Sequence, residues 1–239
     1  MRQVVARRVF LVEAGLAGAA LAVPRITSAA NRAPTLLDHI LLGCNDLDRG
    51  VAFVEEQTGV RAAFGGVHPG AGTRNALLSL GQNRYLEIIA PDPAQPAGAD
   101  SRGLHNLKEP VLVGWAAHPG DIEAFAIQLK GQGIAAIGPT PGSRKRPDGR
   151  ILHWKTLRLK DEADGLLPFF IEWSADTTHP SIDAPKGCAL VRFEVTTPNP
   201  VQLLVKLAQM KLDLSVVHGA RSRLHAVIRG AKAEVDLTS

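Results

Sequence analysis

LDHILLGCNDLDRGVAFVEEQTGV at residues 37–60, HPGAGTRNALLSLG at 68–81 and YLEIIAPDP at 85–93 form the stretch that decides the fold. Asp46 is typical of a helix N-cap and Gly59 of a helix stop, so this part predicts a helix over about 47–57. The predicted strands cover 36–44, 61–67, 73–80 and 84–90. His39 in the first strand and Glu87 in the last place two potential metal ligands on one small βαβββ unit.

Two more segments repeat the same pattern of a strand, a helix and further strands. The second runs from Val111 to Trp173, with a basic, turn-rich loop expected over Pro139 to Arg150. The third begins at Cys188, and its helix opens at Asn199 and Pro200. The predicted organisation is a first module over 31–98, a second over 99–181 and an appended βαβββ-like module over 182–239.

Residues 1–30 have the pattern of an export signal. Arg7 and Arg8 precede an apolar run from Ala14 to Val23, which is too short to span a bilayer, and small residues follow it. Arg7-Arg8-Val9-Phe10-Leu11 resembles the twin-arginine signal of bacteria, although Glu13 departs from that pattern. We therefore expect a periplasmic or secreted protein; an amphipathic N-terminal helix is the alternative.

The charge pattern and the absence of known motifs argue against nucleic-acid binding, membrane association and several classes of enzyme. The net charge is +4, but removal of residues 1–30 takes away four arginines and one glutamate and leaves +1. No basic stripe with interleaved aromatic residues indicates nucleic-acid binding, and no membrane association is expected once the signal is removed. Cys44 and Cys188 are either a pair or two buried thiols. No Ser nucleophile elbow, phosphate-binding loop or dinucleotide fingerprint occurs.

The opening stretch resembles the first module of the vicinal oxygen chelate superfamily, in its glyoxalase-like subgroup. RPDGRILHW at 146–154 and LLPFFIEWSAD at 166–176 are similar to the matching second module. The resemblance covers about residues 36–181. It implies an α+β fold in which two paired βαβββ modules form a cup-shaped mixed sheet, with the third module appended.

The resemblance also implies a divalent metal bound by the first and fourth strands of each module; a site of two carboxylates and one imidazole would suit Zn, Ni, Mn, Fe or Co. Carried over, His39, Glu87 and Glu172 are the expected metal ligands, with Glu87 and Glu172 as the catalytic carboxylates. A fourth ligand is missing, since the first strand of module two reads VLVGWAA. His118 and His153 are the remaining candidates, and the strand pattern indicates that His153 faces away from the cup.

Further residues are expected to line the cup and contact substrate. They are Asn75, Arg74, His68, Trp154 and Trp115. Thr156 and Arg158 share the predicted face of Trp154, whereas Arg144, Lys145 and Arg146 are expected on a solvated loop. The segment His179-Pro180-Ser181 either folds over the cup mouth or forms a surface loop.

The resulting hypothesis is an exported, metal-dependent lyase, isomerase or dioxygenase that acts on a small oxygenated molecule. One alternative is a module of the same fold that binds or sequesters a small molecule without catalysis, and another is a purely structural protein whose site has decayed. A homodimer is a further expectation from the resemblance.

Overall fold

The computed structural model describes residues 33–81, 83–96 and 103–239, so the predicted signal at 1–30 lies outside the described residues. Two βαβββ units come first along the described chain. The first contains β1 (Leu37–Gly43), α1 (Leu47–Thr58), β2 (Ala63–His68), β3 (Thr73–Gly81) and β4 (Arg84–Pro91). The second contains β5 (Val111–Ala117), α2 (Ile122–Gly131), β6 (Ala136–Lys145), β7 (Ile151–Leu159) and β8 (Phe169–Trp173). Short helical turns, η1 (Leu104–Asn106) and α3 (Pro180–Asp183), flank the second unit.

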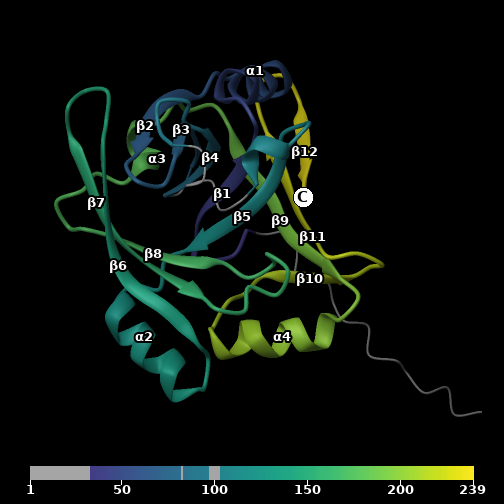
Figure 1. The fold of residues 1–239 in the computed structure, drawn as a ribbon. Helices are drawn as coiled ribbons and strands as arrows, with labels where there is room; N and C mark the ends of the chain where they lie inside the picture. Colours follow the sequence, from purple (N-terminus) through teal and green to yellow (C-terminus); the bar gives the residue numbers. More distant parts are fainter. Residues whose placement is uncertain (1–32, 82, 97–102) are drawn as a thin grey trace, which may run out of the picture.

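The two units share one eight-stranded sheet in the order β2-β3-β4-β1-β5-β8-β7-β6. In each unit the first strand runs parallel to the fourth, and the units join through the antiparallel pair β1 and β5. The sheet curls, so that its concave face forms a cup between the two units (Figure 1). This is the α+β architecture expected from the resemblance, with paired βαβββ modules.

Local capping chemistry explains where the helices of the two units begin and end. The Asp46 side chain accepts a hydrogen bond from the Arg49 amide, and Gly59 adopts a left-handed conformation with φ 78° at the end of α1. Asp121 caps α2 in the same way, through the Ala124 amide. The predicted caps of α1, Asp46 and Gly59, are therefore confirmed.

The expected loop over Pro139 to Arg150 is wrong for most of its length. Strand β6 continues to Lys145 and pairs with β7 as far as Lys145 opposite Ile151. Pro139 and Pro141 lie on this edge strand, where a missing backbone N–H breaks no central ladder. The extension matters for the site because it brings Arg144 to the cup.

The C-terminal part forms a second sheet. It contains β9 (Ala189–Thr197), α4 (Pro200–Gln209), β10 (Ser215–His218), β11 (Arg223–Arg229) and β12 (Glu234–Thr238). The order of elements is again βαβββ, but the sheet order is β10-β9-β11-β12. The first strand therefore lies inside this sheet, beside its second and third strands, and the unit does not repeat the pairing of the cup modules.

One apolar core joins both sheets and the helices that cover them. Trp115 on β5 is completely buried and packs edge-on against Phe193 on β9, with ring centroids 5.4 Å apart. Cys44 and Cys188 are both buried free thiols, and burial raises the pKa of Cys44 to about 11. The described residues thus contain two isolated thiols rather than a disulfide.

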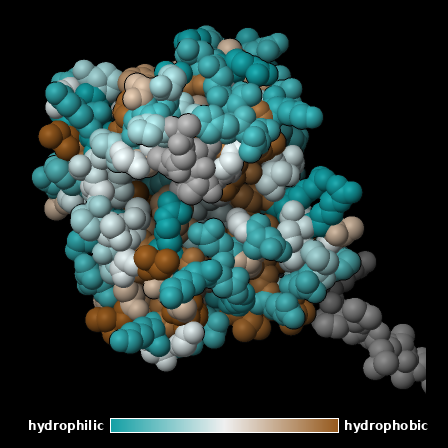
Figure 2. Space-filling model, viewed as in Figure 1, coloured by the Kyte–Doolittle hydropathy of each residue, from teal (hydrophilic) through white to brown (hydrophobic). Residues whose placement is uncertain are grey.

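The outer surface is mostly polar in the view of Figure 2, with apolar patches along the edge where Figure 1 places α2 and α4. Ile127 on α2 and Val201 on α4 are the most exposed large apolar side chains there. Among the described helices, none has the length and apolar character needed to cross a membrane.

Candidate functional site

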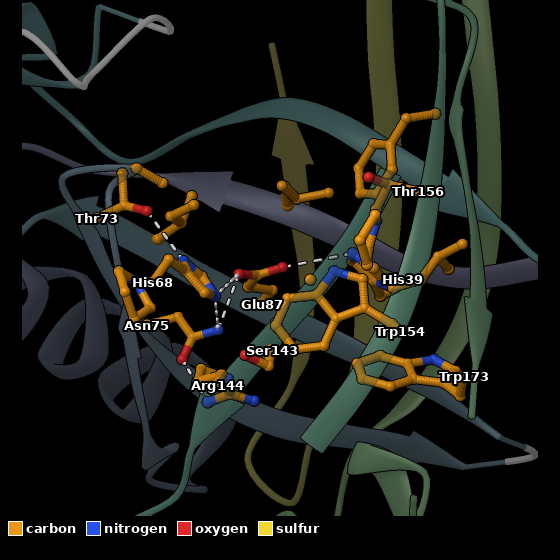
Figure 3. Close-up of a pocket in the computed structure, with 18 of the residues that line it drawn as sticks. His39, His68, Thr73, Asn75, Glu87, Ser143, Arg144, Trp154, Thr156 and Trp173 are labelled. Carbon is orange, nitrogen blue, oxygen red and sulfur yellow. Dashed lines mark hydrogen bonds and ion pairs between the residues drawn. The ribbon is translucent and has the colours of Figure 1, made fainter. Parts of the chain in front are cut away.

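A cavity of about 450 Å³ opens in the cup, with walls from both modules (Figure 3). The polar residues that line it are His39, His68, Thr73, Asn75, Glu87, Ser143, Arg144, Thr156 and Arg158. The aromatic and large apolar residues are Leu41, Tyr85, Ile89, Trp154, Phe169, Ile171 and Trp173. Module one thus supplies most of the hydrogen-bonding groups, and module two supplies arginines and an aromatic wall.

His39 is fixed in place by its neighbours on three sides. Its Nδ1 lies 2.7 Å from Oδ1 of Asp38. Its ring stacks on Tyr85 at 4.5 Å and meets Phe169 edge-on at 5.5 Å. The pairing of β1 with β5 shifts between Leu37 and His39, so Asp38 is the extra residue of a β-bulge. Because of this bulge, the side chain of Asp38 can contact that of His39, the next residue in the chain.

Asp38 is a buried carboxylate that accepts hydrogen bonds from three rings. Besides His39, its Oδ2 accepts from Nε1 of Trp173 at 3.1 Å and from Nε2 of His179 at 3.2 Å. Burial alone would raise the pKa of Asp38, but the hydrogen bonds and charges of the two histidines hold this pKa well below its ordinary value. Asp38 is therefore ionised at neutral pH, and Nδ1 of His39 carries the proton of their shared hydrogen bond.

Glu87 faces His39 inside the cavity. Its Oε2 lies 3.4 Å from Nε2 of His39, and its Oε1 accepts a hydrogen bond of 2.9 Å from Nδ2 of Asn75. Burial would raise the pKa of Glu87, but the charges of His39 and His68, the Asn75 hydrogen bond and the charge of Arg144 together lower it. Glu87 is consequently ionised at neutral pH.

Asn75 links this carboxylate to Arg144 of the other module. Nη1 of Arg144 donates to Oδ1 of Asn75 at 2.9 Å. Because arginine only donates and a carboxylate only accepts, the orientation of the Asn75 amide is determined by its two partners. The Asn75 amide nitrogen is also 3.3 Å from Nε2 of His68, whose Nδ1 lies 2.9 Å from Oγ1 of Thr73.

Five of the expected site residues come together in this cavity: His39, His68, Asn75, Glu87 and Trp154. Thr156 and Arg158 line it beside Trp154, as the strand pattern predicted. His153 is exposed and its backbone pairs with Thr177, so it faces away from the cup as expected.

Glu172 does not join this group, which corrects the expected ligand set. The cup-facing residues of β8 are Phe169, Ile171 and Trp173, and Glu172 lies on the other face of the strand. There its Oε2 accepts a hydrogen bond of 2.6 Å from the Ile122 amide at the start of α2. A register error of one residue reverses the face of every side chain on a strand.

Two expected substrate contacts also lie outside the cavity. Trp115 pairs with Ile40 across the β1–β5 ladder, points into the core and donates from Nε1 to the Leu166 carbonyl. Arg74 alternates with Asn75 on β3 and does not line the cavity, and its charge is one of the smaller causes that lower the pKa of Asp92. Both predictions named a residue on the wrong face of its strand.

The sequence prediction missed Arg144, Asp38 and Trp173 as site residues, and it left the role of His179 open. Arg144 was assigned to a solvated loop, although it is 3% exposed in the cup. Asp38 was not recognisable from the sequence, because strict alternation along β1 would place its side chain on the opposite face from His39. The bulge at Asp38 breaks this alternation. Trp173 lines the cavity, and both Trp173 and His179 donate hydrogen bonds to Asp38. The segment at His179 lies behind Tyr85 and Trp173 rather than over the mouth of the described cavity.

A scan against protein-family models matches residues 37–210 to the glyoxalase-like domain. The chain belongs to the glyoxalase-like domain family. No curated protein matches it. Among solved structures, a hypothetical protein from Staphylococcus aureus has 18% identity and a TM-score of 0.58, and the match covers 84% of each chain. This likeness shows a shared fold.

Two further solved structures are more distant. Methylmalonyl-CoA epimerase from Mycobacterium tuberculosis has 19% identity and a TM-score of 0.41, over 58% of this chain and 87% of that one. A variant of the Streptomyces coelicolor enzyme in complex with 2-nitronate-propionyl-CoA has 21% identity and a TM-score of 0.44, over 61% and 100%.

The donor set of this glyoxalase-like domain does not fit the expected divalent metal. In the paired strands of module one, His39 lies opposite Tyr85, and Glu87 follows two residues later. The corresponding positions of module two are Ala116 and Ile171, which offer no donor atom. Nowhere in the described ranges do three or more His, Cys, Asp or Glu side chains form a group that could hold a metal. The strand positions expected to hold a metal thus supply two donors, which fall short of the three protein ligands typical of a catalytic site.

Proposed function

We propose that this glyoxalase-like protein is an enzyme of the isomerase or lyase type that moves a proton on a small oxygenated substrate. The observation that supports the proposal is the line Asp38–His39–Glu87, which ends in a cavity large enough for a small molecule. A histidine held by a buried carboxylate on Nδ1 presents its Nε2 for general acid–base catalysis.

In this proposal Nε2 of His39 accepts a proton from the substrate carbon next to an oxygenated carbon. Asp38 holds the imidazole in the tautomer that can accept, and its charge stabilises the imidazolium that forms. Glu87 adds a second negative charge 3.4 Å from Nε2 and can accept a hydrogen bond from a substrate hydroxyl group. The imidazolium then returns the proton to another face or atom of the substrate, or the carbanion expels a leaving group.

Proton exchange tests this function directly. A panel of small 2-hydroxy and 2-oxo compounds is incubated with the protein in D₂O, and loss of the C–H signal is followed by NMR. We expect His39→Gln to slow exchange by about 10²–10⁴-fold, the usual contribution of a general base. His153→Gln, an exposed histidine outside the cup, is the matched control. Wild-type exchange in both His39→Gln and Glu87→Gln would refute the proposal.

Binding without catalysis is a second candidate, which the aromatic wall of the cavity favours. Trp154 and Trp173 pack edge-on with ring centroids 5.5 Å apart, and both line the cavity. Such a wall holds an apolar or aromatic ligand by area and shape. A compound that quenches tryptophan fluorescence at saturation but never exchanges a proton would support this function instead.

Export remains a proposal that rests on the sequence of residues 1–30. Arg7 and Arg8 before a short apolar run support twin-arginine export to the periplasm. Cell fractionation of the Arg7→Lys, Arg8→Lys double variant tests it. Retention of the variant in the cytoplasm is the expected result, and unchanged export would contradict this route.

A further inference from the structure

Arg144 is a buried cation that makes no direct ion pair with a carboxylate among the described residues; Glu87, in the same cavity, acts on it only at longer range. Its side chain is 3% exposed, and its hydrogen bond goes to the neutral amide of Asn75 rather than to a carboxylate. Burial lowers the pKa of Arg144, but a guanidinium remains charged in proteins. Burying a charge is costly unless an opposite charge pairs with it. Arg144 thus lies at the cavity wall with no carboxylate bonded to it, where an anionic ligand can pair with it directly.

The fold is shaped to bring this guanidinium into the cup. A Cβ atom on Gly65 would collide with Nη1 of Arg144 and Oδ1 of Asn75. One on Gly66, where φ is 139°, would lie 2.6 Å from the Lys145 carbonyl oxygen. Only glycine at both positions of β2 lets β6 approach closely enough for Arg144 to reach Asn75.

The neighbours of Arg144 indicate the kind of anion. Figure 3 shows Arg144 below Asn75, with Ser143 and the indole of Trp154 beside it. A guanidinium offers a planar fork of N–H groups that matches a carboxylate in two parallel hydrogen bonds. Glu87, whose charge acts on Arg144, already places one negative charge in the cavity, so a singly charged ligand fits better than a dianion.

We propose that Arg144 is the docking site for the carboxylate of a 2-oxygenated acid, with the body of the ligand against Trp154. The binding claim stands on Arg144 and its surroundings. Only the statement that this ligand is also the substrate of His39 rests on the proposed function. Because binding and proton exchange are measured separately, failure of one leaves the other interpretable.

Tryptophan fluorescence supplies the binding assay, since two of the three tryptophans line the cavity. The probes are mandelate, its neutral amide mandelamide and benzylphosphonate, each titrated into the full chain. We expect wild-type protein to bind mandelate at least about tenfold more tightly than mandelamide, the effect of a charge-assisted hydrogen bond. Benzylphosphonate, titrated with mandelate at alkaline pH where it is mainly a dianion, is expected to bind more weakly than mandelate.

Variants assign the effect to Arg144. Arg144→Gln should weaken mandelate binding by about ten- to a hundredfold and change mandelamide binding less than twofold. Arg144→Lys keeps the charge without the fork and should give an intermediate loss. Lys145→Gln, the exposed neighbour on β6, is the matched control and should bind like the wild type.

Three outcomes would overturn the inference. They are equal binding of mandelate and mandelamide by the wild type, unchanged mandelate binding by Arg144→Gln, and tighter binding of the phosphonate than of mandelate. The first and third comparisons use wild-type protein alone, so the test stands even where a variant folds poorly.

Discussion

Replacement of Asp38 by Asn tests the arrangement of the site most sharply. In the wild type, Oδ1 of Asp38 faces the His39 ring, and Oδ2 accepts from Trp173 and His179. An asparagine has one acceptor oxygen and one amide group that only donates. Trp173 can only donate as well, so the oxygen must stay on its side, and the new amide then points at Nδ1 of His39.

The consequence is a change of tautomer at His39. Its Nδ1 must become the acceptor, its proton moves to Nε2, and the lone pair that would take the substrate proton is lost. We expect Asp38→Asn to reduce proton exchange by about 10²–10⁴-fold, without removal of any group that touches substrate. Binding of mandelate should change little, because Arg144 is unaffected.

The same substitution should destabilise the protein in a pH-dependent way. Loss of one hydrogen bond to a charged group costs about 1.5–3 kcal/mol, or about 3–12 °C in thermal midpoint for a chain of this size. Since the pKa of Asp38 is lowered in the folded state, its stabilisation is complete above the unfolded value of about 3.9 and declines as the pH falls toward the folded value. The stability gap between wild type and variant should therefore be constant from pH 7 to 5 and narrow below pH 4.

Thermal unfolding at several pH values and D₂O exchange at pH 7 measure both effects. Asp176→Asn, an exposed aspartate at the cavity behind Trp173, is the matched control. Near wild-type exchange in Asp38→Asn would refute the role given to His39. An equal stability gap at pH 3 and pH 7 would refute the ionised state of Asp38.

Three other perturbations have defined expectations. Glu172→Ala should leave proton exchange unchanged and cost about 0.5–2 kcal/mol of stability, because Glu172 caps α2 at the Ile122 amide; a large loss of exchange at full stability would restore Glu172 to the site. Gly65→Ala should displace Arg144 and so abolish the preference for mandelate over mandelamide. Gly131→Ala should retain this preference, because a Cβ atom at Gly131 has no atom within 4 Å. Dialysis against a chelator should leave exchange unchanged, since the donor set is short of three ligands; loss of exchange that returns with one added metal would contradict this.

The fold and the first half of the site were predictable because the signals were local. Cap residues fix α1, and alternation from His39 onward in β1 and along β4 puts His39 and Glu87 on the cup-facing side of their strands. The resemblance then places these strands side by side. Asn75 and His68 follow from the same stretch.

The second half was not predictable in the same way. Both faces of β8 are apolar, because Phe170 packs in the core while Phe169 and Ile171 face the cup, so alternation could not show where Glu172 points. The prolines of β6 are typical of a loop, and only the sheet order shows an edge strand that tolerates them. Because this strand was expected to be a loop, Arg144 was not predicted to reach the cup.

The contact between β2 and β6 has a consequence for how the cup can open. These strands are the two ends of the eight-stranded sheet, and they meet near Gly65, Gly66 and Arg144 without a backbone ladder between them (Figure 1). The cup is thus closed by a seam in which β6 packs on the two glycines of β2, and this seam can part without the loss of any strand pairing. A ligand anion held on Arg144 beside Asn75 binds the closed seam better than the open one, so ligand binding and closure of the cup favour each other by the same free energy.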